Sequence, residues 1–61
     1  MEIQGITLSK EHIGKYVYYV HSKTVVTKGT IIDWNDIHVS ILFPISTFPH
    51  KCDPSKLKWK I

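Results

Sequence analysis

Residues 30–43 read TIIDWNDIHVSILF, and this stretch decides the fold. It contains two runs rich in β-branched and aromatic residues, 30–34 and 37–43, which are separated only by Asn35 and Asp36. Such runs favour strands, and an Asn-Asp pair tolerates the left-handed backbone geometry of a tight turn. We therefore predict a β-hairpin in which the first run pairs with the second.

Further strands are predicted on both sides of this hairpin. Upstream, residues 15–20 (KYVYYV) have the same composition, and Gly29 indicates a bulge or bend where the hairpin begins. Downstream, a short strand around residues 50–52 and an alternating strand at 57–61 (LKWKI) flank residues 53–55 (DPS), which are typical of one tight helical turn. The chain has no alanine and many isoleucines, valines and threonines. An all-β fold is expected.

The 61 residues are expected to form a single domain with a small core. Residues 1–12 are predicted to be a lead-in segment, with a short strand at 1–8 and one helical turn capped by Ser9. Because Cys52 is the only cysteine, no intramolecular disulfide stabilises the domain, and packing or self-association must do so. No membrane span or secretory signal is recognisable, so we expect a cytoplasmic protein.

The order of these signals resembles that of small SH3-like barrels of the KOW and Tudor-like kind, including the short barrel proteins that bacteriophages and prophages encode. The resemblance covers about residues 13–61. Its four pieces are residues 14–19 (GKYVYY), 28–33 (KGTIID), 37–43 (IHVSILF) and 52–58 (CDPSKLK). It implies a five-stranded SH3-like small barrel with a short helical turn before the last strand. It also implies a binding module, and a phage origin implies one that modulates or inhibits a host protein.

Large apolar side chains are predicted to gather on the outer face of the sheet. The period of two places Val17 and Tyr19 toward the core. The predicted partner-binding residues on the other face are Tyr16, Tyr18, Trp34 and Leu42. Contiguous exposed apolar area usually marks an interface, in which Tyr and Trp are enriched.

Several interpretations of this outer face stay open. Residues 1–8 fold over it, or a protein partner or a second copy covers it. Alternatively, nucleic-acid bases stack on Tyr16, Tyr18 or Trp34, or these rings form a methyl-lysine cage. Of these interpretations, we expect a protein partner.

The lysines indicate nucleic acid as the alternative partner. The chain has eight lysines, no arginine and five acidic residues, and its net charge of +3 favours anionic partners. The lack of arginine argues against sequence-specific reading of DNA. The predicted nucleic-acid-binding residues are Lys51, Lys56, Lys58 and Lys60. The other interpretation of this strip is a solvated strand face that discourages edge pairing.

No constellation of residues indicates catalysis, a metal ion or a cofactor. Cys52 follows His50 by two positions, and the remaining candidates for a site are His12, His38 and Asp53. A zinc site typically uses two close ligand pairs, and a thiol nucleophile needs a positioned base. We therefore expect a non-enzymatic protein without cofactor or metal, bound to a protein or, alternatively, to nucleic acid, with no membrane partner and with homo-oligomerisation as a further option.

Overall fold

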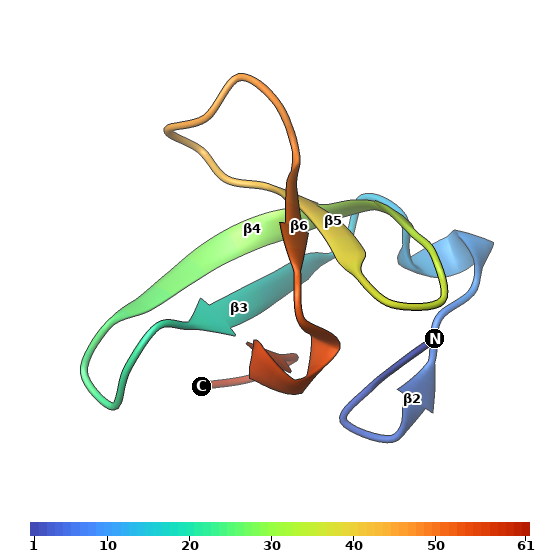
Figure 1. Ribbon diagram of the computed structural model, residues 1–61, viewed down its shortest axis with the longest axis horizontal. Helices are drawn as coiled ribbons and strands as arrows, with labels where there is room; N and C mark the ends of the chain where they lie inside the picture. Colours follow the sequence, from blue (N-terminus) through green and yellow to red (C-terminus); the bar gives the residue numbers. More distant parts are fainter.

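The predicted hairpin lies at the centre of a five-stranded antiparallel sheet (Figure 1). In the computed structural model, which describes residues 1–61, β4 (Val26–Trp34) pairs with β5 (Val39–Leu42). Asn35 fixes the turn, because its side-chain oxygen accepts hydrogen bonds of 2.8 Å from the backbone N–H groups of Ile37 and His38. The hairpin is confirmed, although β4 begins at Val26, four residues before its predicted start.

Three further strands complete the sheet in the order β6-β5-β4-β3-β7. They are β3 (Tyr16–Val20), β6 (His50–Cys52) and β7 (Leu57–Lys58). The all-β prediction is confirmed. The five strands are present, but the sheet is open because no ladder joins its edge strands β6 and β7, so they do not close into the predicted small barrel.

The short β7 explains why the sheet stays open. It pairs only with β3, through Leu57 opposite Tyr19 and Lys58 opposite Tyr18. The predicted strand over residues 57–61 stops early because Trp59 turns to the N-terminal segment, where its backbone N–H donates to the side-chain oxygen of Gln4 over 2.9 Å. With only two residues, β7 is therefore too short to form a ladder with β6.

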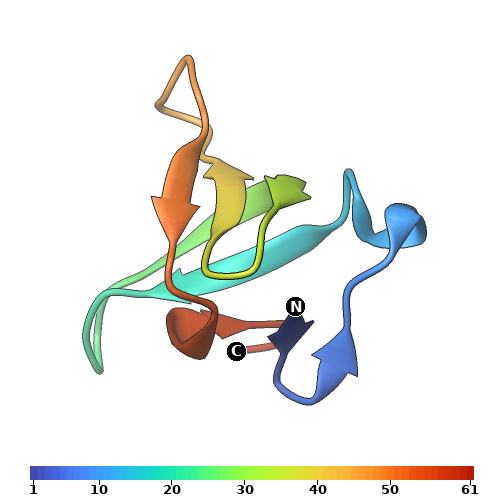
Figure 2. The same cartoon turned by 45° about the vertical axis from the view of Figure 1, so that its right-hand side comes forward.

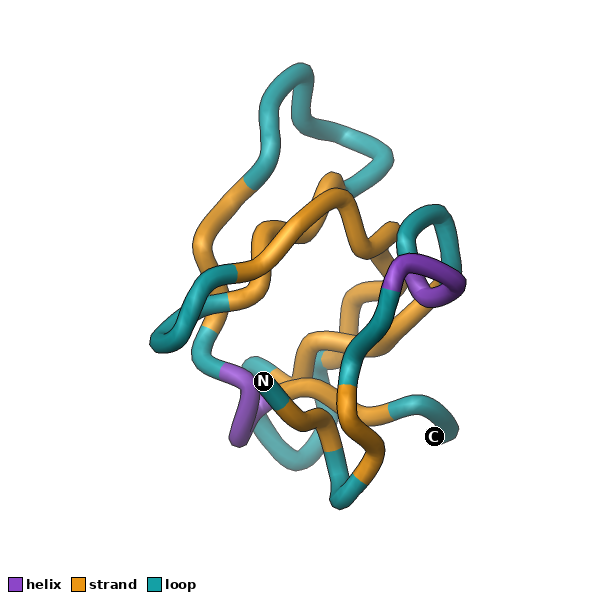
Figure 3. Tube along the Cα trace, turned by 90° about the vertical axis from the view of Figure 1, so that its right-hand side faces the viewer, coloured by secondary structure: helices purple, strands orange, loops and turns teal.

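The only helical segments are two short 3-10 turns (Figure 3). The first, η1 (Lys10–His12), follows Ser9 as predicted, and the second, η2 (Pro54–Lys56), lies at the predicted turn before the last strand. Neither turn has the length or the apolar character to cross a membrane.

The N-terminal segment forms a small hairpin instead of the single predicted strand. Its strands are β1 (Glu2–Ile3) and β2 (Ile6–Thr7), and both turn residues have positive φ, 49° at Gln4 and 81° at Gly5. The β1–β2 hairpin lies beside the C-terminal segment (Figure 2). The indole N–H of Trp59 donates to the carbonyl of Ile3 over 2.8 Å and fixes this contact.

The core lies between the concave face of the sheet and the β1–β2 hairpin. Its buried side chains are those of Ile3, Leu8, Val17, Ile31, Val39, Ile41, Cys52 and Leu57. Gly29 is buried beneath them, and a Cβ at this position would collide with the side chain of Ile41 and approach the ring of Phe43 to 3.0 Å. Gly29 therefore permits close packing. It does not form the predicted bulge, because it pairs regularly with Val17.

Candidate binding surfaces

A bulge in β4 decides which face carries Trp34. The register with β5 shifts between Ile31 and Asp33, so the alternation of side chains reverses there. Trp34 consequently pairs with buried Val39 and packs against the core. The prediction that Trp34 belongs to the outer face is wrong, because it assumes unbroken alternation and the bulge turns Trp34 to the inner face.

The other three predicted partner-binding residues do lie together on the outer face. Tyr16 pairs with Thr30, and Thr30 pairs with Leu42, so these side chains form a row across β3, β4 and β5. Tyr18 follows on the same face of β3. Tyr16 is 60% exposed, and Tyr18 and Leu42 are half-buried.

The N-terminal segment leaves this outer face uncovered. Ile3 and Leu8 belong to the core cluster on the opposite face, together with Val17 and Ile31. The interpretation in which residues 1–8 fold over the outer aromatic side chains is therefore wrong. A segment with two buried aliphatic side chains packs where the largest buried area is available, and this is the concave face.

The predicted lysine strip is divided by the fold. Lys51 and Lys58 project from opposite edge strands, while Lys56 lies in η2 and Lys60 lies beyond the end of β7. All four side chains are exposed. A continuous strip would require one strand face, and the chain turns a corner at η2 instead.

Another lysine joins the tyrosines on the outer face. Lys28 and Lys58 pair with Tyr18 from either side, and the ammonium group of Lys28 lies 4.2 Å from the centre of the Tyr16 ring. This distance is within the range of a cation–π contact. The sequence alone does not indicate Lys28, because its position beside Tyr18 depends on the β3–β4 register. The outer surface is defined here as Tyr16, Tyr18, Lys28, Leu42 and Lys58.

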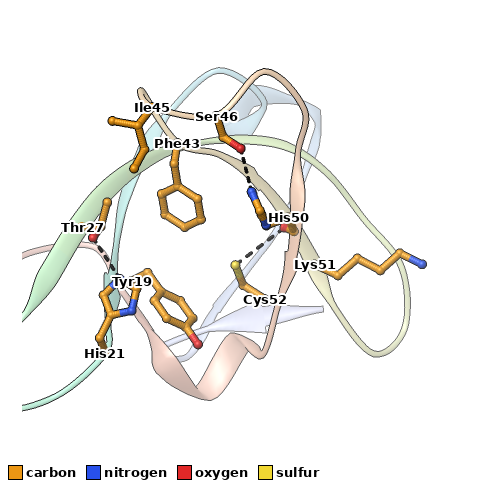
Figure 4. A pocket seen from close by; sticks show the side chains of 9 residues that line it. All are labelled: Tyr19, His21, Thr27, Phe43, Ile45, Ser46, His50, Lys51 and Cys52. Carbon is orange, nitrogen blue, oxygen red and sulfur yellow. Dashed lines mark hydrogen bonds between the residues drawn. The ribbon is translucent and has the colours of Figure 1, made fainter.

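An open cleft of about 550 Å³ lies on the concave face, at the end that the β1–β2 hairpin does not cover (Figure 4). Its walls include Tyr19 and Phe43, whose rings meet edge to face with 6.1 Å between their centres. The lining residues are Tyr19, His21, Thr27, Phe43, Ile45, Ser46, His50, Lys51 and Cys52. Alternation predicts that Tyr19 faces the core, but no local pattern predicts the cleft, because the cleft depends on how far the β1–β2 hairpin extends.

Two hydrogen-bonded pairs hold polar groups at the rim of the cleft. One joins Nε2 of His21 to Oγ1 of Thr27 over 2.9 Å, and the other joins Oγ of Ser46 to Nε2 of His50 over 2.7 Å. Both pairs are exposed. The cleft thus combines aromatic walls with hydroxyl and imidazole groups, which suits the recognition of a largely apolar side chain.

Cys52 and His50 contact each other through the backbone of His50. The Cys52 thiol donates to the backbone carbonyl of His50 over 3.6 Å, and burial raises the pKa of this thiol. A raised pKa keeps the sulfur protonated and weakly nucleophilic. No group of three or more His, Cys, Asp or Glu side chains is arranged to hold a metal ion.

Comparisons with known proteins do not assign the chain to a family. No protein-family model matches it, and no curated protein or solved structure matches it either. The resemblance to SH3-like barrels stays a prediction.

Proposed function

We propose that this protein is a small, non-enzymatic binding module that docks onto a protein partner through its outer surface. The observation that carries this proposal is the row formed by Tyr16 and Leu42 beside Tyr18 on a face that the N-terminal segment leaves uncovered. Tyrosine side chains on an uncovered sheet face contribute large contact area at a small loss of conformational freedom. A partner that buries this row gains most of its binding energy there.

The charges on this face favour a partner with an acidic surface. Lys28 and Lys58 flank Tyr18, whereas Asp33 is the acidic residue that the bulge and the pairing with Ser40 place on the same face of β4. Together with the net charge of +3, these lysines attract an acidic surface over long range and disfavour contact with a second outer surface.

The proposed architecture is an SH3-like strand arrangement with an unclosed seam between β6 and β7. The strand order β6-β5-β4-β3-β7 and the helical turn η2 before the last strand support it. Following the resemblance to short barrel proteins of phages and prophages, the proposed partner is a host protein of the cytoplasm. Occupation of one of its surfaces would modulate or inhibit that protein.

A second candidate function is binding of nucleic acid on the same face. Tyr18 between two lysines combines a surface for base stacking with two groups that neutralise phosphates. Of the predicted strip, only Lys58 contributes to this arrangement. This candidate predicts that the logarithm of the affinity falls linearly with the logarithm of the salt concentration.

Affinity capture with matched variants tests the protein-binding proposal. Immobilised wild-type protein, Tyr16→Ala/Tyr18→Ala and Ile37→Ala are exposed to extract from the cells in which the protein occurs, and retained proteins are identified by mass spectrometry. Ile37 is 69% exposed in the β4–β5 turn, outside the outer surface, and serves as the control. We expect a partner retained by wild type and by Ile37→Ala but not by the double variant. Equal retention by a double variant that still unfolds cooperatively would contradict the proposal.

A titration with labelled duplex DNA, single-stranded DNA and RNA separates the two candidates. Salt-sensitive binding that is lost in Tyr18→Ala and weakened in Lys28→Ala would favour the nucleic-acid candidate. An absence of binding at low salt would remove it and leave the protein partner.

A further inference from the structure

The loop between β5 and β6 presents large apolar side chains to solvent. In the segment 44–49 (PISTFP), Ile45 is 97% exposed and Phe48 is 65% exposed. The loop stands away from the rest of the molecule at the top of Figure 1. Pro44 and Pro49 restrict the backbone at both ends of the loop, so Ile45 and Phe48 are displayed from a stiffened segment. A turn needs no such residues, because small and polar residues build one equally well.

The cleft lies directly beside this loop. Ile45 and Ser46 belong to both, and the ring of His50 is 5.8 Å from that of Phe43 in the cleft and 5.9 Å from that of Phe48 in the loop. Together with its hydrogen bond to Ser46, His50 fixes the loop relative to the cleft. An apolar protrusion and an apolar recess are thus held next to each other before any binding occurs, which lowers the entropic cost of binding.

The loop and part of the cleft come from the longest stretch of the chain without a formal charge. Residues 37–50 contain no formally charged side chain, and Lys51 is the one lysine among the lining residues of the cleft. Its ammonium group points away from the cleft in Figure 4. Two copies of a chain with a net charge of +3 repel each other, and the repulsion is weakest where uncharged faces meet. Neither an acidic nor a basic ligand finds an oppositely charged group inside the cleft.

We propose that two copies of this protein pair through this face, with Ile45 and Phe48 of each copy filling the cleft of the other. A two-fold interface requires a self-complementary surface, and a protrusion beside a recess on the same chain meets this requirement. The cleft of about 550 Å³ has room for these side chains. Pairing adds apolar burial to a chain with only nine buried residues, for which such a contribution is large.

The pairing leaves the outer surface free, because the cleft lies on the opposite face of the sheet. A dimer would therefore present two outer surfaces at once. The inference does not rest on the proposed function, and either can fail without the other.

Sedimentation velocity over a range of concentrations tests the pairing. Reductant is included so that a disulfide between two Cys52 thiols does not mimic it. We expect wild type to reach twice its mass of 7.1 kDa and Ile45→Asp or Phe48→Asp to dissociate at least about 30-fold more readily, as for interface hot spots. Ile37→Asp is the matched control, since Ile37 is an exposed isoleucine at the other end of β5. A wild type that stays monomeric at millimolar concentration would overturn the proposal.

A mixing experiment tests the reciprocal insertion itself. Thr27→Arg fills the cleft and leaves the loop intact, whereas Phe48→Asp alters the loop and leaves the cleft intact. His21→Arg, also in the cleft wall and outside the loop, replaces Thr27→Arg if the latter does not fold by circular dichroism. We expect neither variant to dimerise alone and an equimolar mixture to form a mixed dimer, which native mass spectrometry detects. Absence of the mixed dimer would contradict the insertion. A wild-type dimer that Tyr18→Ala disrupts but Phe48→Asp does not would place the interface on the outer surface and overturn the proposal.

Discussion

The concave face of the sheet has two ends that differ in what covers them. At one end the β1–β2 hairpin lies over Val17, Ile31 and Leu57, and these side chains are almost completely buried. At the other end nothing covers Tyr19 and Phe43, and the cleft remains open. Val17 and Tyr19 are only two positions apart on β3 and share its inner face, yet Val17 is fully buried and Tyr19 lines the cleft.

The residue types at the two ends correspond to these different surroundings. The covered end is built mainly from aliphatic side chains, which need no hydrogen-bond partners in a dry interior. The open end carries tyrosine, histidine, serine and threonine, and two pairs of these polar side chains bond to each other at its rim. We therefore expect the buried side chains of the covered end to contribute most to the free energy of unfolding, and the side chains of the open end to be available for binding.

The largest effect is expected from a truncation at the covered end. Ile31→Ala removes a completely buried side chain and should lower the free energy of unfolding by about 2–5 kcal/mol. For a chain of 61 residues, this is a large part of the total stability. Phe48→Ala, in the exposed loop, should change it by less than about 0.5 kcal/mol in the monomer. Urea unfolding at low protein concentration measures both, and similar losses for the two variants would refute the comparison.

An added methyl group at the junction of the two ends should have the next largest effect. In Gly29→Ala the new Cβ collides with the side chain of Ile41 and meets Phe43 at 3.0 Å, so the side chains that join core and cleft must shift. Overpacking of this kind costs about 1–3 kcal/mol. Lys28→Ala, at the neighbouring outward position, is the control in the same denaturation experiment. A stability of Gly29→Ala equal to that of wild type would mean that the two ends are not tightly joined.

A smaller and more local effect is expected where the covering hairpin is attached. Trp59→Phe removes the indole donor to the Ile3 carbonyl, a bond of 2.8 Å, and should weaken the closed state of the hairpin by about 1 kcal/mol. Amide exchange of Leu8, whose N–H bonds to the Met1 carbonyl over 2.9 Å, should then accelerate about fivefold. The amide of Ile31 in the sheet is the internal control. Equal acceleration at both amides would show that the hairpin does not open separately.

The sequence predicts the strands better than it predicts the surfaces. Composition and alternation located β3, β5 and β6 and placed Tyr16, Tyr18 and Leu42 on one face, because these depend on local spacing. The bulge beside Ile32 has no comparable local signal, since it arises from the register between β4 and β5. The bulge turns Trp34 to the inner face, whereas unbroken alternation predicts the outer face.

The cleft and the open sheet depend on contacts between distant segments. The alternation of residues 57–61 continues past Lys58, but Trp59 bonds to Gln4 and Ile3, which are more than fifty positions away. The extent of the β1–β2 hairpin, and therefore of the cleft, is set by the same contacts. No pattern within a single strand contains this information.

The smallest effect is expected at Asp53, which caps η2 at the corner between the edge strands. Its side chain accepts hydrogen bonds of 2.9 Å from the backbone N–H and the hydroxyl of Ser55. The backbone bond is the main cause that lowers the pKa of this carboxyl below its ordinary value. Because the ionised form is the one that the fold favours, its contribution is present above the pKa of the unfolded chain and is lost as the pH falls through the lower folded value.

Asp53→Asn isolates this contribution, since the amide oxygen of asparagine also caps but does not titrate in this range. The melting temperature of wild type minus that of the variant should be highest near neutral pH and should fall as the pH drops below about 4, the ordinary range of an aspartate. Because the two proteins differ only at residue 53, the difference isolates the contribution of this side chain. The change should be small because the carboxyl is fully exposed and solvent screens it. A difference that is constant from pH 7 to pH 2 would show that the Ser55 bonds do not favour the ionised carboxyl, and the corner would then contribute through its shape alone.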